Sequence, residues 1–224
     1  MKRTLHRYYD LMADHFGPTN WWPGDSDFEI AVGAILTQNT AWRNVEKALA
    51  NLTSENLLSP RAILDCGEAR LEMALKPSGF FRVKARRLTS FCAFLVEGYG
   101  GSMGRLAEQP LDTLRAELLG VHGIGPETAD DIILYACEQP VFVVDAYTRR
   151  ILSRHGHVRP EIGYEDLRAL FEKHLDKNVA LYKDYHGQIV RTGNTYCRAT
   201  PKCESCPLAP TLRRGQPILD DTQK

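Results

Sequence analysis

The chain has 224 residues, 28 Lys and Arg against 28 Asp and Glu, and a hydrophobic fraction of 43 %. This composition indicates a globular protein of one large or two small domains and excludes a disordered or fibrous chain. The longest apolar run, residues 31–36, is too short to span a bilayer, and the N-terminal residues lack the apolar core of a signal peptide. We therefore expect a cytoplasmic protein with no membrane partner. Averaged over the whole chain, zero net charge argues against a nucleic-acid partner.

Helical spacing dominates the first half of the sequence. Apolar residues recur every three or four positions on both sides of residues 37–40 and over residues 111–119, where Gly120 ends the helix. Pro126 suits the first position of the next helix. Residues 141–144 have the composition of a buried strand, but one strand without a partner does not form a sheet. The pattern therefore predicts an all-α fold.

The second half continues the helical pattern. Asp145 can cap a helix that ends near Gly156, and residues 165–175 and 179–190 are predicted to form two further helices. The tail after Pro207 is rich in Pro, Arg and Asp, and we expect it to be loosely ordered.

A glycine-rich hairpin is expected at about residues 119–129, between two helices. Gly123 and Gly125 let backbone N–H groups face outward beside the start of the second helix, where amides and helix dipole together bind anions. On DNA such a site holds a phosphate and positions the protein without reading sequence. A Gly-x-Gly link alone is more often a simple turn. The flanking Leu-Leu-Gly and Thr128-Ala129 favour the phosphate site.

Asp145 is the candidate catalytic residue. It follows the apolar residues 141–144 and lies seventeen positions beyond Thr128. An Asp before a helix is usually a cap, but a capping carboxylate can also face a ligand. One helix downstream of a phosphate site, Asp145 is placed to act on the same DNA strand.

The run GIGPETADDIILYACEQPVFVVDAY, residues 123–147, resembles the helix-hairpin-helix DNA glycosylases of the endonuclease III superfamily. The resemblance extends over nearly the whole chain and implies two helical lobes. A six-helix lobe with the hairpin would span residues 20–139. The other would combine the N-terminal helix, residues 1–19, with residues 140–224. Asp145 matches the essential aspartate of that family.

The resemblance also implies contacts with DNA. Gln38 matches the glutamine that fills the gap left by an extruded base, and Phe80 matches the apolar side chain wedged into the duplex. Basic residues crowd positions 82–87 and 149–159; such runs are usually solvated surface, but here they flank segments already assigned to DNA. The expected DNA-contacting residues are Gln38, Gly79, Phe80, Lys84, Gly123, Gly125, Thr128 and Arg150.

Glu127 decides the implied mechanism. Family members that also cut the DNA backbone carry a lysine nucleophile in the hairpin, and Glu127 stands at the matching position, where no Schiff base can form. The resemblance therefore implies a monofunctional glycosylase that leaves an abasic site. Breaking the N-glycosidic bond develops positive charge on the sugar, which Asp145 would stabilise while orienting the attacking water. The sequence offers no clear general acid, which favours a leaving base that is already cationic.

Aromatic residues lie near the same segments. Trp21-Trp22-Pro23 precedes the first core helix of the hairpin lobe, and Trp42 follows the Gln38 loop. A large aromatic side chain is as often simply core. These motifs nevertheless resemble the 3-methyladenine glycosylase branch, where the flipped base stacks on aromatic rings and a cationic purine gains cation–π energy. The expected pocket residues are Trp21, Trp22, Pro23, Trp42 and Tyr147.

Three cysteines, Cys197, Cys203 and Cys206, lie within ten residues. In the family a [4Fe-4S] cluster is held by four cysteines spaced x6, x2 and x5. Here the first gap is one residue shorter, and Leu212 stands where the fourth cysteine is expected. An iron–sulfur cluster, a zinc site and a loop that has lost its metal are all compatible with this pattern.

The predicted function is removal of alkylated purines such as 3-methyladenine from double-stranded DNA, in base-excision repair, by a monomer. One alternative is the same fold acting on another damaged or mismatched base. The other is a non-catalytic hairpin module that senses damage. Asp145 discriminates against the second, because a protein that only binds DNA does not need that carboxylate.

Overall fold

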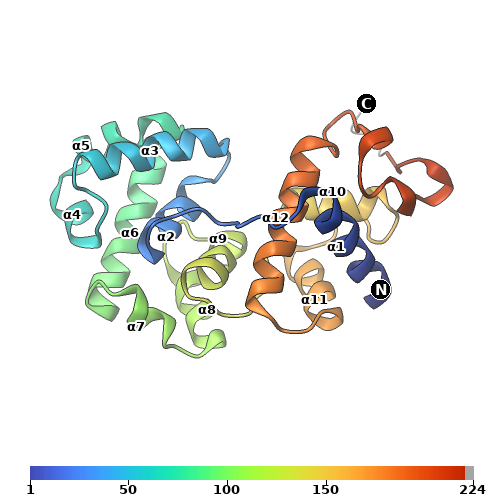
Figure 1. The fold of residues 1–224 in the computed structure, drawn as a ribbon. Helices are drawn as coiled ribbons and strands as arrows, with labels where there is room; N and C mark the ends of the chain where they lie inside the picture. Colours follow the sequence, from blue (N-terminus) through green and yellow to red (C-terminus); the bar gives the residue numbers. More distant parts are fainter. Residues whose placement is uncertain (220–224) are drawn as a thin grey trace. The chain divides into compact units, whose positions relative to one another are not determined.

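The computed structural model describes residues 1–219, and all regular secondary structure in that range is helical. The described residues form twelve α-helices joined by loops and short single-turn helices, with no strand among them (Figure 1). The predicted all-α class is confirmed. Among the same residues, none of the helices combines the length and the hydropathy that crossing a bilayer requires.

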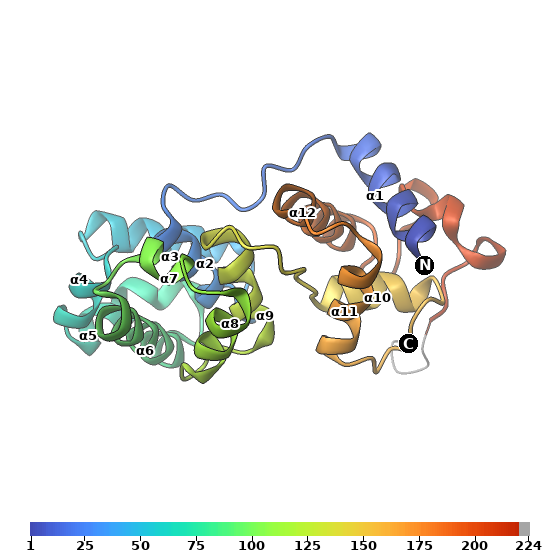
Figure 2. The ribbon, with the colours of Figure 1, turned by 90° about the horizontal axis from the view of Figure 1, so that it is seen from below.

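The chain divides into two compact units, seen from a second side in Figure 2. One is Pro23–Gln139; the other joins Met1–Trp22 to Pro140–Lys224. The first boundary lies three residues beyond the one expected from the sequence, so Trp21 and Trp22 belong to the unit that also contains Asp145.

The unit Pro23–Gln139 is built around α2 (Asp27–Leu36), which Ser26 caps through a 3.2 Å bond from the Glu29 amide. Seven of its ten residues are buried, and α2 packs against α3, α6 and α9. The expected six-helix lobe contains eight α-helices, several of them short. The others are α3 (Trp42–Ser54), α4 (Pro60–Asp65), α5 (Glu68–Leu75), α6 (Phe81–Tyr99), α7 (Met103–Ala107), α8 (Leu111–Gly120) and α9 (Pro126–Asp131).

The predicted hairpin joins α8 to α9 and is anchored through α9. This helix continues directly into a π-helical turn, Ile132–Ala136, whose five side chains are buried and packed on α2. Burial of large apolar side chains stabilises the fold by about 1.5–3 kcal/mol each. The hairpin therefore sits on a fixed platform.

The second unit contains α1 (Lys2–Phe16), α10 (Ala146–Arg154), α11 (Tyr164–His174) and α12 (Val179–Thr195). Helix α12 packs against both α1 and α10. Residues 141–144 lead into α10 as a buried, extended segment without strand pairing, and Phe142 stacks on Phe171 with ring centroids 4.2 Å apart.

The tail after α12 is more ordered than the sequence suggested. It forms single-turn helices at Cys203–Ser205, Ala209–Thr211 and Arg213–Gly215. Leu208 is fully buried, and the Ile218 amide donates a 2.8 Å hydrogen bond to the Arg154 carbonyl. The tail is thus attached to α10 at these points; its last part, residues 220–224, lies outside the described residues.

Candidate active site

Asp145 caps α10, as its sequence position predicted. Its Oδ1 accepts hydrogen bonds from the Thr148 amide at 2.7 Å and from the Thr148 hydroxyl at 2.8 Å. The Thr148 hydroxyl also accepts from the Asp145 amide at 3.3 Å, which completes a capping box. Both bonds to the side chain use Oδ1, so Oδ2 is left outside the cap.

Helix α12 brings His186 to the other oxygen of that carboxylate. Its Nε2 lies 3.8 Å from Oδ2 of Asp145, and the two side chains are only 5 % and 11 % exposed. Burial by itself raises the pKa of Asp145, but the interactions with His186 and Thr148 outweigh it and hold the pKa below its ordinary value. Asp145 is therefore a carboxylate at neutral pH.

Two glycines of α12 give aromatic side chains room beside this pair. A Cβ atom at Gly187 would lie 2.8 Å from Cβ of Trp21, and one at Gly193 would lie 2.3 Å from Cδ1 of Tyr147. Trp22 packs on Trp21 with ring centroids 5.5 Å apart. Three of the five expected pocket residues thus lie in the unit that holds Asp145.

The remaining two belong to the unit Pro23–Gln139. Pro23 is exposed at its first position, and Trp42 begins α3 with a partly exposed side chain. A pocket shared by all five residues stays a prediction.

Gln38 is fixed by the hairpin. Its Nε2 donates to the Thr128 hydroxyl at 2.8 Å and to the Gly123 carbonyl at 3.3 Å, while its Oε1 accepts a hydrogen bond from Arg87. These bonds join the α2–α3 loop to the hairpin and to α6. Gln38, Thr128 and Glu127 line a cavity of about 250 Å³.

The hairpin residues therefore have different roles from one another. Gly123 has a φ of +86°, and a Cβ there would meet Cγ of Arg87 at 2.2 Å, so glycine is required for the approach of α6. Thr128 is buried and its hydroxyl accepts a hydrogen bond from Gln38, and its contact with DNA stays a prediction. Gly125 is exposed at the N-cap of α9, where a backbone phosphate contact is geometrically open.

Phe80 has the exposure that a wedge needs. Its side chain is 69 % exposed, and both Gly79 and Phe80 have positive φ angles, 69° and 45°. Such a backbone is strained for a non-glycine residue and persists only where the surroundings fix it. The Ser78 hydroxyl bonds the Leu75 carbonyl at 2.7 Å, which helps to hold the loop.

Two residues predicted to contact DNA have partners within the protein. Lys84 is 1 % exposed, and its Nζ donates to the Ser78 carbonyl at 2.6 Å; burial lowers the pKa of this ammonium to about 8. Lys84 supports the Phe80 loop from inside the protein. The Arg150 guanidinium stacks over the Tyr147 ring at 5.0 Å and donates to the Gly193 carbonyl at 3.3 Å.

Residues 32–177, more than half of the chain, match the family model described as HhH-GPD superfamily base excision DNA repair protein. The chain belongs to this superfamily. It is thus a DNA glycosylase of base-excision repair, and its all-helical fold is the HhH-GPD fold.

Two curated relatives and two solved structures illustrate the similarity. A proposed DNA repair glycosylase, MJ1434, of Methanocaldococcus jannaschii is 44 % identical over 206 residues, covering 91 % of this chain and 93 % of the relative. Endonuclease III of Thermotoga maritima is 31 % identical, covering 80 % of this chain and 79 % of the relative. The structure of H. pylori 3-methyladenine DNA glycosylase (MagIII) bound to 1,N6-ethenoadenine gives a TM-score of 0.72 at 29 % identity, covering 86 % and 96 %. The structure of a trapped endonuclease III–DNA covalent intermediate gives a TM-score of 0.82 at 25 % identity, covering 96 % of this chain and 97 % of that chain.

Within this HhH-GPD protein, Glu127 stands on the first turn of α9. Its carboxylate is exposed and lines the Gln38 cavity. A carboxylate cannot form the imine on which lyase chemistry depends.

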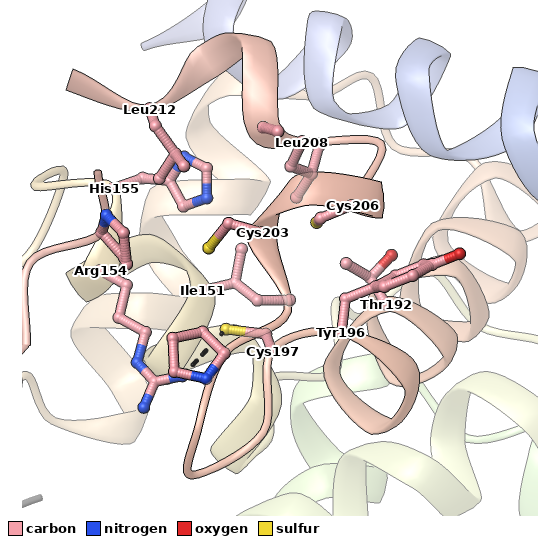
Figure 3. Close-up of a pocket in the computed structure, with 13 residues that line it drawn as sticks. Ile151, Arg154, His155, Thr192, Tyr196, Cys197, Cys203, Cys206, Leu208 and Leu212 are labelled. Carbon is pink, nitrogen blue, oxygen red and sulfur yellow. Dashed lines mark hydrogen bonds between the residues drawn. The ribbon is translucent and has the colours of Figure 1, made fainter. Parts of the chain in front are cut away.

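The cysteine loop of this HhH-GPD protein is held by an arginine. Figure 3 shows Cys197, Cys203 and Cys206 around one cavity with Leu212 and Arg154. Arg154 donates to the Arg198 carbonyl at 2.5 Å, the Ala199 carbonyl at 3.2 Å and the Cys197 sulfur at 3.5 Å. Cys197 is buried against it.

These residues do not fit a four-thiolate cluster. Three thiols line the cavity, and Leu212 lines it in place of a fourth. Among the residues that the structure describes, no group of His, Cys, Asp and Glu is arranged to hold a metal ion. No step of the reaction is assigned to a metal.

Proposed function

We propose that this glycosylase is monofunctional and removes alkylated purines of the 3-methyladenine type from double-stranded DNA. The observation that carries the proposal is the geometry of Asp145. Its Oδ1 is bound by the α10 cap, its Oδ2 is left outside the cap, and its pKa is held below the ordinary value. Because Glu127 replaces the hairpin lysine, water has to be the nucleophile.

The proposed reaction breaks the bond between sugar C1′ and the base nitrogen, and the electron pair leaves with the base. The positive charge on the sugar is stabilised by Oδ2 of Asp145, and water then adds to C1′ and passes its proton to Oδ2, from which it leaves to solvent. With the carboxylate about 4 Å from the cationic sugar and an effective dielectric of about 20, the Coulomb attraction lowers the activation free energy by about 4 kcal/mol. That is about a thousandfold in rate.

This contribution favours a cationic substrate. An N-alkylated purine that carries a positive charge leaves as a neutral base, so it needs no general acid. The aromatic side chains of Trp21, Trp22 and Tyr147 lie in the unit with Asp145. Aromatic faces stabilise a flipped cationic base by stacking and cation–π attraction. The H. pylori glycosylase, 29 % identical, is named for 3-methyladenine, which supports the same class here.

Three features would engage the duplex. Phe80 is exposed for insertion, Gln38 is held rigidly enough to occupy the space left by the flipped base, and Gly125 presents its backbone amide at the start of α9. We propose that the protein binds damaged double-stranded DNA as a monomer by these contacts.

The test is base release from a duplex treated with a methylating agent, with the released bases identified by mass spectrometry. The wild-type protein is expected to release 3-methyladenine. Release of oxidised pyrimidines or of a mismatched base alone would overturn the substrate assignment. Tight binding to damaged DNA with no release of any base would indicate a damage sensor.

A second candidate is removal of another damaged base by the same fold. The 31 % identity with an endonuclease III favours it. A panel of duplexes with one lesion each, covering alkylated, oxidised and mismatched bases, separates the two candidates by the base that appears in solution.

A further inference from the structure

His186 lies at the one oxygen of Asp145 that the α10 cap leaves open. The cap saturates Oδ1 with two donors from Thr148, so chemistry has to use Oδ2. The imidazole of His186 lies within ion-pair distance of Oδ2. This histidine comes from α12, 41 positions along the chain.

The cap restrains the carboxylate from the Oδ1 side. Both Thr148 bonds end on Oδ1, and the terminal torsion of an aspartate has a broad energy minimum. Rotation about the Cβ–Cγ bond moves both oxygens together, so a contact on Oδ2 restrains the same rotation from the other side. Such a contact narrows the range of directions in which Oδ2 meets a sugar or a water.

We propose that His186 is a positioning residue that aims Oδ2 of Asp145 at the reacting sugar, an inference that rests on the proposed function. Its Nε2 would donate to Oδ2 once DNA is bound. The 3.8 Å separation is longer than a hydrogen bond. Catalytic hydrogen bonds are often long in free enzymes and tighten in the complex.

The packing of α12 keeps His186 buried beside Asp145. Its side chain is 5 % exposed, α12 packs directly on α10, and the next residue, Gly187, is covered by Trp21 and Thr19. A buried imidazole costs free energy unless a polar partner compensates for lost hydration. The Asp145 carboxylate is a partner of that kind.

The test compares single-turnover base release by wild type, His186→Leu and His186→Gln, on whichever lesion the wild type removes. His186→Leu is expected to slow release at least tenfold at saturating enzyme, about 1.4 kcal/mol, while duplex affinity stays the same. His186→Gln keeps an N–H donor at a similar reach and should restore most of the rate. A slower release at unchanged duplex affinity, restored by glutamine, would not follow from a purely structural role.

Gln188→Leu is the matched control. Gln188 is buried on the same helix but bonds the Gly17 carbonyl and Asp184 rather than Asp145. The substitution Gln188→Leu should lower the unfolding temperature and leave the rate of base release unchanged. Base release by His186→Leu at the wild-type rate would overturn the inference, and so would a glutamine variant as slow as the leucine variant. Absence of release by the wild type on every lesion would overturn the proposed function as well.

Discussion

Asp145 uses its two oxygens for different purposes. Oδ1 is occupied by the Thr148 bonds that begin α10, whereas Oδ2 faces His186. The cap could be predicted from the sequence because its partner lies three residues away. The contact with His186 could not, because it depends on how α12 packs against α10. In the sequence, His186 stands only as one residue of the predicted helix 179–190.

Substitutions at Asp145 should separate the two purposes. Asn caps a helix as well as Asp, so Asp145→Asn should unfold at nearly the wild-type urea concentration. Asp145→Ala removes the acceptor for both Thr148 donors and should lower the free energy of unfolding by about 1 kcal/mol. Urea unfolding followed by circular dichroism measures both. An Ala variant as stable as the wild type would show that the cap does not stabilise α10.

Side-chain direction explains the internal contacts of two residues that were predicted to contact DNA. Lys84 belongs to a basic run, yet its stem passes inward and its ammonium bonds the Ser78 carbonyl. Thr128 lies in the hairpin, yet it turns toward Gln38. Composition along the chain shows which charges and hydroxyls are near a loop, but the local helix geometry decides which of them reach solvent.

Among the elements, the loop between α5 and α6 is the clearest candidate for inserting into DNA. Phe80 is 69 % exposed at a positive φ, and Lys84 and Ser78 hold the backbone beneath it. An exposed aromatic side chain on a fixed loop contributes little to folding. It is available to offset the cost of unstacking a base pair.

Phe80→Ala should therefore slow base release from duplex DNA by about tenfold, or 1.4 kcal/mol, and leave release from single strands unchanged. The free energy of unfolding should change by less than about 0.5 kcal/mol, because the ring is exposed. Val83→Ala, on the exposed side of the same helix, is the control and should affect neither. Equal losses on duplex and single strands would contradict a wedge.

The cysteine loop is the element where the family pattern is incomplete. Arg154 holds it by two backbone carbonyls, and Leu212 lines the cavity in place of a fourth thiol. Of the three alternatives compatible with the sequence, we favour a loop without metal.

Anaerobically purified protein should be colourless and contain neither iron nor zinc in stoichiometric amount. Metal analysis by mass spectrometry and visible absorbance measure this. Leu212→Cys restores a fourth thiol and should raise the iron content relative to wild type. About four iron atoms per wild-type chain would show instead that a cluster is held with a ligand outside the three cysteines.

On the scale of the whole molecule, zero net charge no longer argues against DNA. The family is a DNA-repair family. The structure also shows that the charges near the wedge are fewer than the sequence suggested, since Lys84 is buried and Arg82 lies 3.6 Å from Glu72. Backbone amides at the hairpin need no side-chain charge. The fold class was predictable because helical periodicity persists along the chain; the unit boundary at Trp22 depends on packing.

Replacement of the hairpin lysine by Glu127 predicts the state of the DNA after base release. The abasic strand should stay intact until alkali is added, and borohydride should trap no covalent complex. Denaturing gels of the labelled strand, with and without each treatment, measure this. A trapped complex would mean that another amine of the chain attacks the sugar.

The most direct test of the proposed mechanism is the yield of free 3-methyladenine from methylated duplex, measured by mass spectrometry for wild type and Asp145→Asn. Asp184→Asn is the control, because Asp184 is a second carboxylate that is hydrogen-bonded and has a lowered pKa in the same unit. The mechanism predicts release by wild type and by Asp184→Asn, and none by Asp145→Asn, which should still bind the duplex. Release by Asp145→Asn at the wild-type rate would contradict it.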